Sequence, residues 1–398
     1  MKKIIMVVIL SLVVIFCSCT VHKQGTDMSK NESSANDNLS GFVSAENHES
    51  LDNHTSNAEN STGDTLRLGV PVVQSGIKNI SFDDERAFSY VVDAGVSRTA
   101  EMAYYSRFGN NIYCSNDSFG TTKITDGVET AFFPDAYNVY EHNGVVYGMI
   151  DAESDSDHGD RFYSRLNEDG THEKIFSCGN VFYFNDKVYF YKRESENSKS
   201  IRIHSADLNG SNKTVVSDEI SSWPGIEFVF EYDGYLLYKA GYLDGVVSAT
   251  PDGRFVSILS YSEFLNIEFV NNGYLYYTSR ETVNRPLLLG GDFERYSLWR
   301  IDINGANREC LITASLPCDT QNVFETACFA GKLILFMQEQ VYVYESDFSE
   351  PEVYDYGGYK CFDIRQIVVT NEDIAITWPN GSLSVHDTNG NVIYKREN

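Results

Sequence analysis

The stretch SLWRIDINGAN, residues 297–307, decides the fold, because an apolar strand-like run ends there at Asn304-Gly305. Asn-Gly pairs supply the positive φ angles that type I′ hairpins need, so this pair predicts a tight connection between antiparallel strands. Similar pairs recur at Asp126-Gly127, Asp169-Gly170, Asn209-Gly210, Asp252-Gly253 and Asn389-Gly390. The successive glycines lie 43, 40, 43, 52 and 85 residues apart, and Asp347-Phe348 stands at the midpoint of the last interval. The spacing predicts seven copies of one unit.

A second series of turn signals alternates with the first, and most of its members precede aromatic strands such as Tyr274-Leu275-Tyr276-Tyr277. Its members are Asn110-Asn111, Asn143-Gly144, Asn185-Asp186, Asp233-Gly234, Asn272-Gly273, Ala330-Gly331 and Glu372-Asp373. Each unit therefore contains two hairpins, which make four strands. Four-stranded units of roughly 40 to 45 residues are typical of a β-propeller. We expect an all-β propeller of seven four-stranded blades over residues 102–398, with eight blades as the alternative.

Residues 65–101 do not follow this period, although 66–73 and 88–92 each resemble a strand. We expect this segment to close the propeller by pairing with the last blade or to extend it toward an eighth. Within a blade whose four strands alternate in direction, the first and third turns lie at the same end. Both turn series therefore fall on one rim of the blades, here called the turn rim. The insertions and the connections between blades share the opposite rim, called the loop rim.

The segment SLWRIDINGAN and its counterpart IHSADLNGSNK, residues 203–213, resemble units of the low-density-lipoprotein-receptor-like and TolB-like propellers of Gram-positive bacterial lipoproteins. The resemblance covers about residues 102–398 and implies a propeller, and it carries over no catalytic residue. The full YWTD strand of the receptor family is absent. The resemblance therefore implies no receptor-like ligand.

The first nineteen residues read as a lipoprotein signal peptide. Lys2 and Lys3 precede thirteen apolar residues, 4–16, a run too short to cross a bilayer as a helix and suited to a signal-peptide core. Ser18-Cys19 then resembles the lipobox of bacterial lipoproteins, which implies diacylglyceryl modification of Cys19 and a lipid anchor on the extracytoplasmic face of the cell membrane. A plain signal peptide with another cleavage site is the alternative.

Residues 20–64 differ in composition from the rest of the chain. They hold 8 Ser, 7 Asn, no Pro, 8 acids against 2 bases, and Phe42 as their one aromatic residue. Such a segment buries too little apolar surface to offset its ordering entropy, so we expect a disordered tether.

The whole chain has 31 Lys+Arg, 57 Asp+Glu and a formal charge of -26. That charge repels phosphate backbones and argues against nucleic-acid partners.

Aromatic residues in the loops expected on the loop rim are the candidate binding residues: Trp223, Phe293, Tyr296 and Trp378. Exposed rings can stack on sugars or anchor a protein partner, and the alternative is that they fold back over the blades. The loop-rim segments are 151–161, 192–200, 217–224, 261–266, 279–297 and 313–322. Insertions gathered on one rim are typical of a binding surface, although neutral loop growth would produce them too.

One of these insertions, residues 151–160, concentrates five carboxylates, and Asp151, Asp155, Asp157 and Asp160 are weak candidate calcium ligands. The loop lacks the EF-hand spacing, so a solvated acidic loop is the main interpretation and no cofactor is expected.

Six cysteines follow the signal: Cys114, Cys178, Cys310, Cys318, Cys328 and Cys361. Their dispersion argues against zinc, and Cys310 with Cys318 is the disulfide pair to test, with buried free thiols as the alternative.

No P-loop, GxSxG, GxGxxG or HExxH motif occurs in the chain. The main hypothesis is accordingly a lipid-anchored extracytoplasmic binding or scaffold module for a protein or glycan of the cell envelope. The alternative is a glycan hydrolase or lyase that uses carboxylates of the axial channel, because such pairs come from separate blades and leave no local motif.

Overall fold

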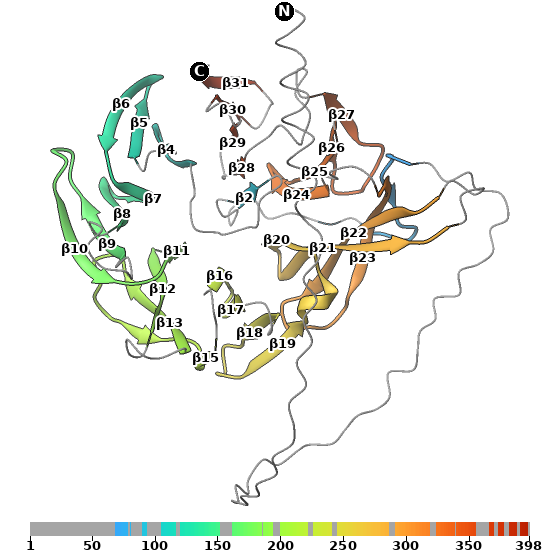
Figure 1. Ribbon diagram of the computed structural model, residues 1–398, viewed down its shortest axis with the longest axis horizontal. Coiled ribbons are helices and arrows are strands. Elements are labelled where there is room, and N and C mark those ends of the chain that lie inside the picture. Colours follow the sequence, from blue (N-terminus) through green and yellow to red (C-terminus); the bar gives the residue numbers. More distant parts are fainter. Residues whose placement is uncertain are drawn as a thin grey trace, which may run out of the picture. The chain divides into compact units, whose positions relative to one another are not determined.

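Seven antiparallel sheets make up the computed structural model, and they follow one another around a central axis in chain order (Figure 1). The described residues are 68–78, 80, 90–93, 105–116, 120–151, 161–184, 186–193, 200–221, 226–240, 245–285, 291–318, 324–338, 340–355, 366–369, 373–377, 382–387 and 391–396. They all belong to one compact unit, Thr65–Asn398. The expected signal with Cys19 and the expected tether lie outside them. The chain is a seven-bladed β-propeller, as predicted, and no eighth sheet occurs among these described residues.

The first three blades run outward from the axis with four strands in sequence order. Blade I consists of β3 (Tyr105–Phe108), β4 (Asn111–Asn116), β5 (Gly120–Thr125) and β6 (Val128–Phe133). Blade II consists of β7 (Ala136–His142), β8 (Val145–Asp151), β9 (Arg161–Leu166) and β10 (His172–Ser177). Blade III consists of β11 (Val181–Phe184), β12 (Lys187–Arg193), β13 (Ser200–Asp207) and an outer strand in two pieces, β14 (Thr214–Val215) and β15 (Ile220–Ser221).

The other four blades follow the same plan. Blade IV consists of β16 (Ile226–Tyr232), β17 (Tyr235–Ala240), β18 (Val246–Ala249) and β19 (Phe255–Leu259). Blade V consists of β20 (Asn266–Asn271), β21 (Tyr274–Val283), β22 (Phe293–Asp302) and β23 (Glu309–Pro317). Blade VI consists of β24 (Phe324–Phe329), β25 (Lys332–Met337), β26 (Gln340–Tyr344) and β27 (Glu352–Asp355). Blade VII consists of β28 (Gln366–Val369), β29 (Asp373–Thr377), β30 (Leu383–Asp387) and β31 (Val392–Arg396).

Two further strands precede blade I and join other blades. β1 (Val72–Val73) pairs with the outer edge of β23 in blade V, and β2 (Tyr90–Asp93) pairs with the inner edge of β28 in blade VII. The segment 65–101 thus pairs in part with the last blade, one of the two outcomes expected for it. β2 thus adds a fifth strand at the inner edge of blade VII and also contacts β24 of blade VI.

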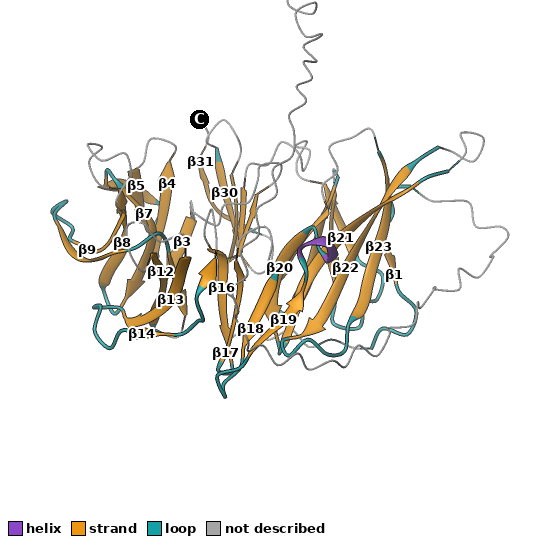
Figure 2. Ribbon diagram, turned by 60° about the horizontal axis from the view of Figure 1, so that its bottom comes forward, coloured by secondary structure: helices purple, strands orange, loops and turns teal. Residues whose placement is uncertain are grey.

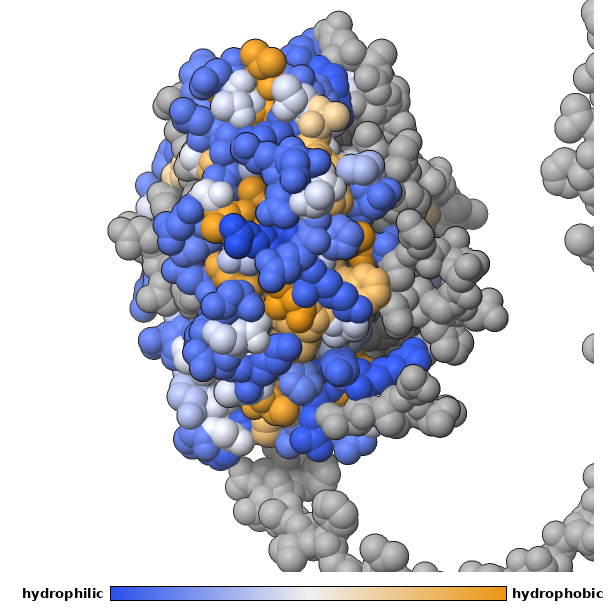
Figure 3. All heavy atoms as spheres, turned by 90° about the vertical axis from the view of Figure 1, so that its left-hand side faces the viewer, coloured by the Kyte–Doolittle hydropathy of each residue, from blue (hydrophilic) through white to orange (hydrophobic). Residues whose placement is uncertain are grey.

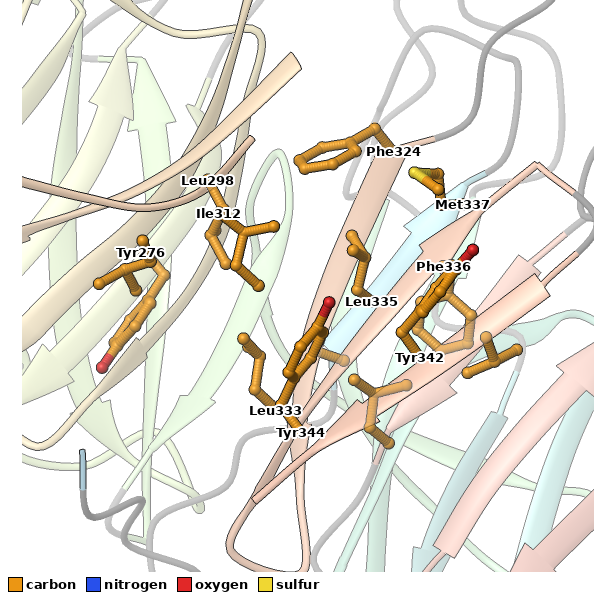
Figure 4. Packing of buried hydrophobic residues seen from close by; sticks show 14 of the residues in the cluster. Tyr276, Leu298, Ile312, Phe324, Leu333, Leu335, Phe336, Met337, Tyr342 and Tyr344 are labelled. Atoms are coloured by element: carbon orange, nitrogen blue, oxygen red, sulfur yellow. The ribbon is translucent and has the colours of Figure 1, made fainter. Parts of the chain in front are cut away.

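The core lies between the blades, where neighbouring sheets pack face to face. Between blades V and VI, Tyr276, Leu298 and Ile312 meet Leu333, Leu335 and Tyr344 (Figure 4). Since both faces of an inner strand are covered, β24 and β25 are buried along nearly their whole length. The outermost strand β6 is mostly exposed. This gradient explains why LILFM, residues 333–337, is continuously apolar, whereas the outer strand VETAFF mixes polar and apolar residues.

The two turn series differ in geometry, which corrects one expectation. Three inner turns are of type I′, because Asn143-Gly144, Asp233-Gly234 and Asn272-Gly273 have positive φ at both residues, whereas the inner turn of blade I has positive φ at Gly109 alone. In the outer turns at Gly170, Gly210, Gly253 and Gly305 only the glycine has positive φ, so type I′ is wrong for them. There a type I turn precedes a left-handed glycine, as Gly210 N donating to Asp207 O shows.

The outer turn of blade I is of the expected type, because Asp126 and Gly127 both have positive φ. In two of the other outer turns, the residue before the glycine has a different role from the expected one. Asn209 Oδ1 accepts the Ser211 N–H at 2.9 Å, and Asn304 Oδ1 accepts the Ala306 N–H at 2.9 Å. Both turn series lie on one rim, as predicted, because Ile303 N of an outer turn donates to Gly273 O of the inner turn in the same blade. The expected turn glycine Gly390 lies outside the described residues.

A short 3-10 helix, η2 (Tyr261–Glu263), accompanies the strands. Within the described ranges no helix has the length and apolar character to cross a membrane. Figure 3 shows the side that carries the first blades, where hydrophobic residues form small separate patches on a hydrophilic surface. Such scattered residues are normal for a protein surface and do not mark an interface.

Candidate functional site

The most prominent described feature of the loop rim is the β21–β22 hairpin of blade V. β20 pairs with β21 only as far as Thr278, whereas β21 and β22 continue to pair from Ser279–Ser297 out to Val283–Phe293. The hairpin therefore extends past the inner strand of its own blade (Figure 2). The sequence was expected to form a loop here, and most of 279–297 is instead regular strand.

Charged side chains of both signs line this extension. Arg280 Nη1 lies 3.6 Å from Glu294 Oε1, and Arg295 Nη1 lies 3.5 Å from Glu281 Oε2. Both arginine side chains are nearly half exposed. The Arg295–Glu281 pair is exposed on both sides and contributes little to stability, so its charges are available to another surface. Glu294 is only 16% exposed, so the Arg280–Glu294 pair is part of the packed base of the hairpin.

Phe293 and Tyr296 lie on this hairpin but are not exposed loop rings, and that expectation was wrong. Their exposed fractions are 1% and 2%. The Arg285 guanidinium covers the Phe293 ring at 5.0 Å from its centroid, and Tyr296 packs on Phe324 of blade VI with ring centroids 5.6 Å apart. β23 and blade VI cover these rings, because Phe293 and Tyr296 pair with Pro317 and Ala314.

The Tyr296 hydroxyl adds a polar link to this packing. It donates to Glu294 Oε2 at 2.7 Å. Burial, reinforced by the bond to Glu294, raises the pKa of Tyr296 to about 12. The phenol therefore stays protonated near neutral pH and keeps donating, which fixes the carboxylate that also faces Arg280. Trp223 and Trp378, the other two candidate rings, lie outside the described residues.

Two carboxylates beneath the hairpin were not singled out from the sequence. Glu268 is the extra residue of a β-bulge in β20, between the pairs Ile267–Tyr277 and Phe269–Tyr276, and it is completely buried. The bulge re-aims its side chain, and the carboxylate accepts bonds from Thr278 Oγ1 at 2.8 Å and from Thr326 N at 3.0 Å. Blade V thereby bonds to the backbone of blade VI.

A reciprocal bond runs from blade V to Glu325 in blade VI. Asn266 Nδ2 donates to Glu325 Oε1 at 3.0 Å. Glutamates inside apolar strands, NIEFVN and FETACF, were the signal that could have revealed both residues. Because Glu268 and Glu325 are buried and hydrogen-bonded between inner strands, they hold two blades together. This arrangement gives a substrate no access to Glu268 and does not support general acid–base chemistry there.

The candidate calcium loop is described at its two ends only. The Asp151 carboxylate accepts the Tyr137 hydroxyl at 3.0 Å and lies 3.4 Å from Arg161 Nε. Asp155, Asp157 and Asp160 lie outside the described residues. Among the residues that are described, no three His, Cys, Asp or Glu side chains gather as metal ligands.

The cysteines of the described blades form no disulfide with one another. Cys310 and Cys318, the pair expected to be tested as a disulfide, are accordingly not bonded to each other. Cys114, Cys178 and Cys328 are buried, which agrees with the alternative of thiols that pack as small hydrophobes. Cys361 lies outside the described residues.

Comparison with known proteins gives a fold-level likeness. No protein-family model and no curated protein matches the chain. Among solved structures, it is similar to BamB from Moraxella catarrhalis at 13% identity, with 79% of this chain and 91% of that chain covered and a TM-score of 0.38. In a nidogen/laminin complex, a similar chain has 12% identity, coverage of 65% and 92%, and a TM-score of 0.36. The computationally designed Ika8 protein has 9% identity, coverage of 77% and 90%, and a TM-score of 0.46. No functional argument rests on these likenesses.

Proposed function

We propose that this chain is a binding module, held by a lipid on Cys19 at the extracytoplasmic face of a cell membrane, which engages a protein of the envelope through the β21–β22 hairpin. The extension of this hairpin past its own blade, with exposed arginines and glutamates on a rigid base, is the observation that carries the proposal. A strand hairpin already fixed by buried rings loses little conformational entropy on binding, which favours affinity.

Local charge supports the same surface. Residues 274–302 contain four arginines and four acids and are formally neutral, whereas the whole chain carries -26. A surface that carries both positive and negative side chains and no net charge can approach another acidic protein without the electrostatic repulsion that the rest of the molecule exerts. Alternating charges also set the register of a partner.

A protein partner is favoured over a glycan. Sugar recognition relies on exposed rings that stack on pyranose faces, and Phe293 and Tyr296 are buried. Glu268 and Glu325 give no support to the hydrolase or lyase alternative, because both carboxylates accept hydrogen bonds between blades V and VI. Trp223 and Trp378 remain proposed contributors on the loop rim.

The anchor is supported by sequence: Lys2 and Lys3, the apolar run and Ser18-Cys19. Cys19→Ala should block lipidation, so the variant should leave the membrane fraction, since two acyl chains supply stable anchoring. Mass spectrometry of the processed N-terminus together with detergent partitioning measures this. A variant that is still acylated and dependent on detergent would contradict the assignment.

The binding surface is tested by charge reversal in the full-length protein. Arg295→Glu should abolish cross-linking to an envelope protein while leaving the melting temperature unchanged, because the side chains of Arg295 and its partner Glu281 are 45% and 68% exposed. Arg254→Glu, an exposed arginine of the turn rim, is the matched control and should bind normally. Loss of binding in the control alone would place the interface on the turn rim. Capture of polysaccharide in place of protein would favour the glycan alternative.

A further inference from the structure

Residues 68–80, which precede blade I, fall into two halves that are attached to the propeller differently. The first half, Leu68–Gln74, includes β1 and follows the outer edge of β23 as an added fifth strand, with Val72 opposite Thr313 and Val73 opposite Ile312. We call this half the strap. Gly69 N donates to Ser315 O and Gln74 N donates to Leu311 O, both at 2.9 Å.

The second half is held much more firmly. Ile80 is buried in the core between blades V and VI, Ile77 packs against the same core, and Ile80 N donates to Ser346 O at 2.8 Å. By contrast, Leu68, Val70 and Val72 of the strap are 44%, 44% and 54% exposed. The strap is thus attached by backbone hydrogen bonds at a sheet edge, by the Gln74 Nε2–Thr313 Oγ1 bond of 3.0 Å and by Val73, which packs against the same core. Its other apolar side chains stay largely exposed. Such a segment opens at a much lower free energy than the core does.

The edge that the strap covers is unlike those of the other blades. β23 has nine residues, whereas the described outer strands β6, β10, β14, β19, β27 and β31 have between two and six. A long, regular edge strand presents a row of N–H and C=O groups that templates another strand. Short outer strands do this poorly. The chain therefore covers the outer edge that is best able to accept an extended segment.

A hinge lies between the two halves. Ser75 and Gly76 form a turn, and Gly76 has a φ of +91° with open space where a Cβ would stand. Opening this turn would free the strap while Ile77 and Ile80 stay packed. An element that is edge-paired, weakly buried and joined by a short hinge has the features of an exchangeable strand.

We propose that the edge of β23 is a strand-addition site, and that its alternative occupant is the strap of a second copy of this chain, so that two copies exchange straps. A second strap reproduces the same hydrogen bonds and the same register, because it is the same sequence on the same edge. Exchange changes only the path of the hinge. It therefore depends on local protein concentration, which pairs of chains held at one surface would raise. The hairpin interface, residues 279–283 and 293–297, lies on β21 and β22, and the strap lies on the far edge of β23, where Ser315 pairs with Arg295 and accepts the Gly69 N–H. Strap exchange requires no partner bound to the hairpin.

Cross-linking between two different full-length variants tests the exchange. One variant carries Val72→Cys and the other Thr313→Cys, and both carry Cys310→Ser and Cys318→Ser to remove neighbouring thiols. Residues opposite each other in an antiparallel pair lie within disulfide range. After mixing and mild oxidation, a disulfide between the two variants forms only if the strap of one chain lies on the edge of the other. Its yield should rise with total concentration.

Two further variants make the result decisive. A double variant that carries Val72→Cys and Thr313→Cys in one chain should cross-link within the monomer when dilute, which shows that the geometry permits the bond. Gly76→Pro should raise the yield between chains by about tenfold, because proline cannot adopt the positive φ of the closed turn. Val72→Cys mixed with Val353→Cys, an exposed position on the outer strand of blade VI, is the matched control and should give no dimer.

Three results would overturn the proposal. The first is a disulfide within the monomer but none between chains at any concentration, in the parent hinge and in Gly76→Pro alike. The second is an equal yield with Val353→Cys, which would indicate random collision. The third is an absent disulfide in the dilute double variant, which would show that the strap does not occupy the edge. Failure of the hairpin charge reversal would leave all of these measurements unaffected.

Discussion

Arg107 on β3 donates from Nη1 to Oδ2 of Asp373, the first residue of β29, at 2.7 Å, and this ion pair joins the first blade to the last. The Asp373 side chain is completely buried and that of Arg107 is 20% exposed. Among the described strands, blades I and VII have none in common, so side chains close the ring between them. Tyr394 and Arg396 of β31 complete this closure by bonding to Glu129 of β6.

Arg107→Ala should lower the free energy of unfolding by about 3 kcal/mol, because it leaves a buried carboxylate without its cation. Urea titration followed by tryptophan fluorescence measures the loss. Arg254→Ala removes an exposed pair with Asp252 and should cost less than about 1 kcal/mol. Equal losses in the two variants would show that the Arg107–Asp373 pair does not support ring closure.

The outer part of the same closure should weaken in acid. Partial burial opposes the ionisation of Glu129, but the Tyr394 hydroxyl and the Arg396 guanidinium outweigh it and hold the pKa of this carboxyl below its usual range. A pKa that is lower in the folded state contributes stability above the unfolded value of about 4.3, and this contribution disappears as pH falls through the folded pKa.

Glu129→Gln provides the measurement for that effect. Its deficit in unfolding free energy relative to the parent should be largest at neutral pH and should shrink below about pH 4.3, as the parent carboxyl becomes protonated. Denaturant titrations at a series of pH values give the two curves. Parallel curves through the acid range would mean that Glu129 does not contribute through its charge.

In the native protein, exposed cysteines should react with a thiol reagent and buried cysteines should not. Burial raises the pKa of Cys114 and of Cys178 to about 12, so almost no thiolate is present at pH 8. Cys318 is exposed and should react with iodoacetamide within minutes, while Cys114 and Cys178 should react only after unfolding. Peptide mapping after timed alkylation follows each site. Rapid labelling of Cys114 in the native protein would contradict the packing between blades VII and I.

Alanine substitutions at two glycines with positive φ distinguish the cost of backbone strain from the cost of a steric clash. Gly253 has a φ of +82° and open space at its Cβ position, so Gly253→Ala should cost about 1 kcal/mol through conformation alone. At Gly245, φ is +70° and a Cβ would stand 2.0 Å from Leu259 O. Gly245→Ala should therefore destabilise considerably more. Thermal unfolding of the two variants gives the order, and the reverse order would contradict the backbone path at Gly245.

The sequence by itself indicated the four-stranded plan of the blades, the rim on which the short turns lie and a count of seven, with eight blades as the alternative. These features follow from local chemistry, because Asn-Gly and Asp-Gly pairs favour turns whatever surrounds them, and their spacing sets strand length. Even the turn type was only half determined: Asn272 adopts a positive φ, whereas Asn304 uses its side chain to bond Ala306 N.

Only the tertiary structure decided which of the apparent loop residues are buried and what the acidic strand residues do. Phe293 and Tyr296 are covered because β23 and Phe324 approach them, and Glu268 is held because Thr326 of the next blade offers its N–H. The pairing of β1 with β23, far along the chain, likewise leaves no local trace. The reason is physical: burial and hydrogen bonding of these groups depend on contacts between distant strands, and a single sequence records turn and strand preferences but not which sheet faces will meet.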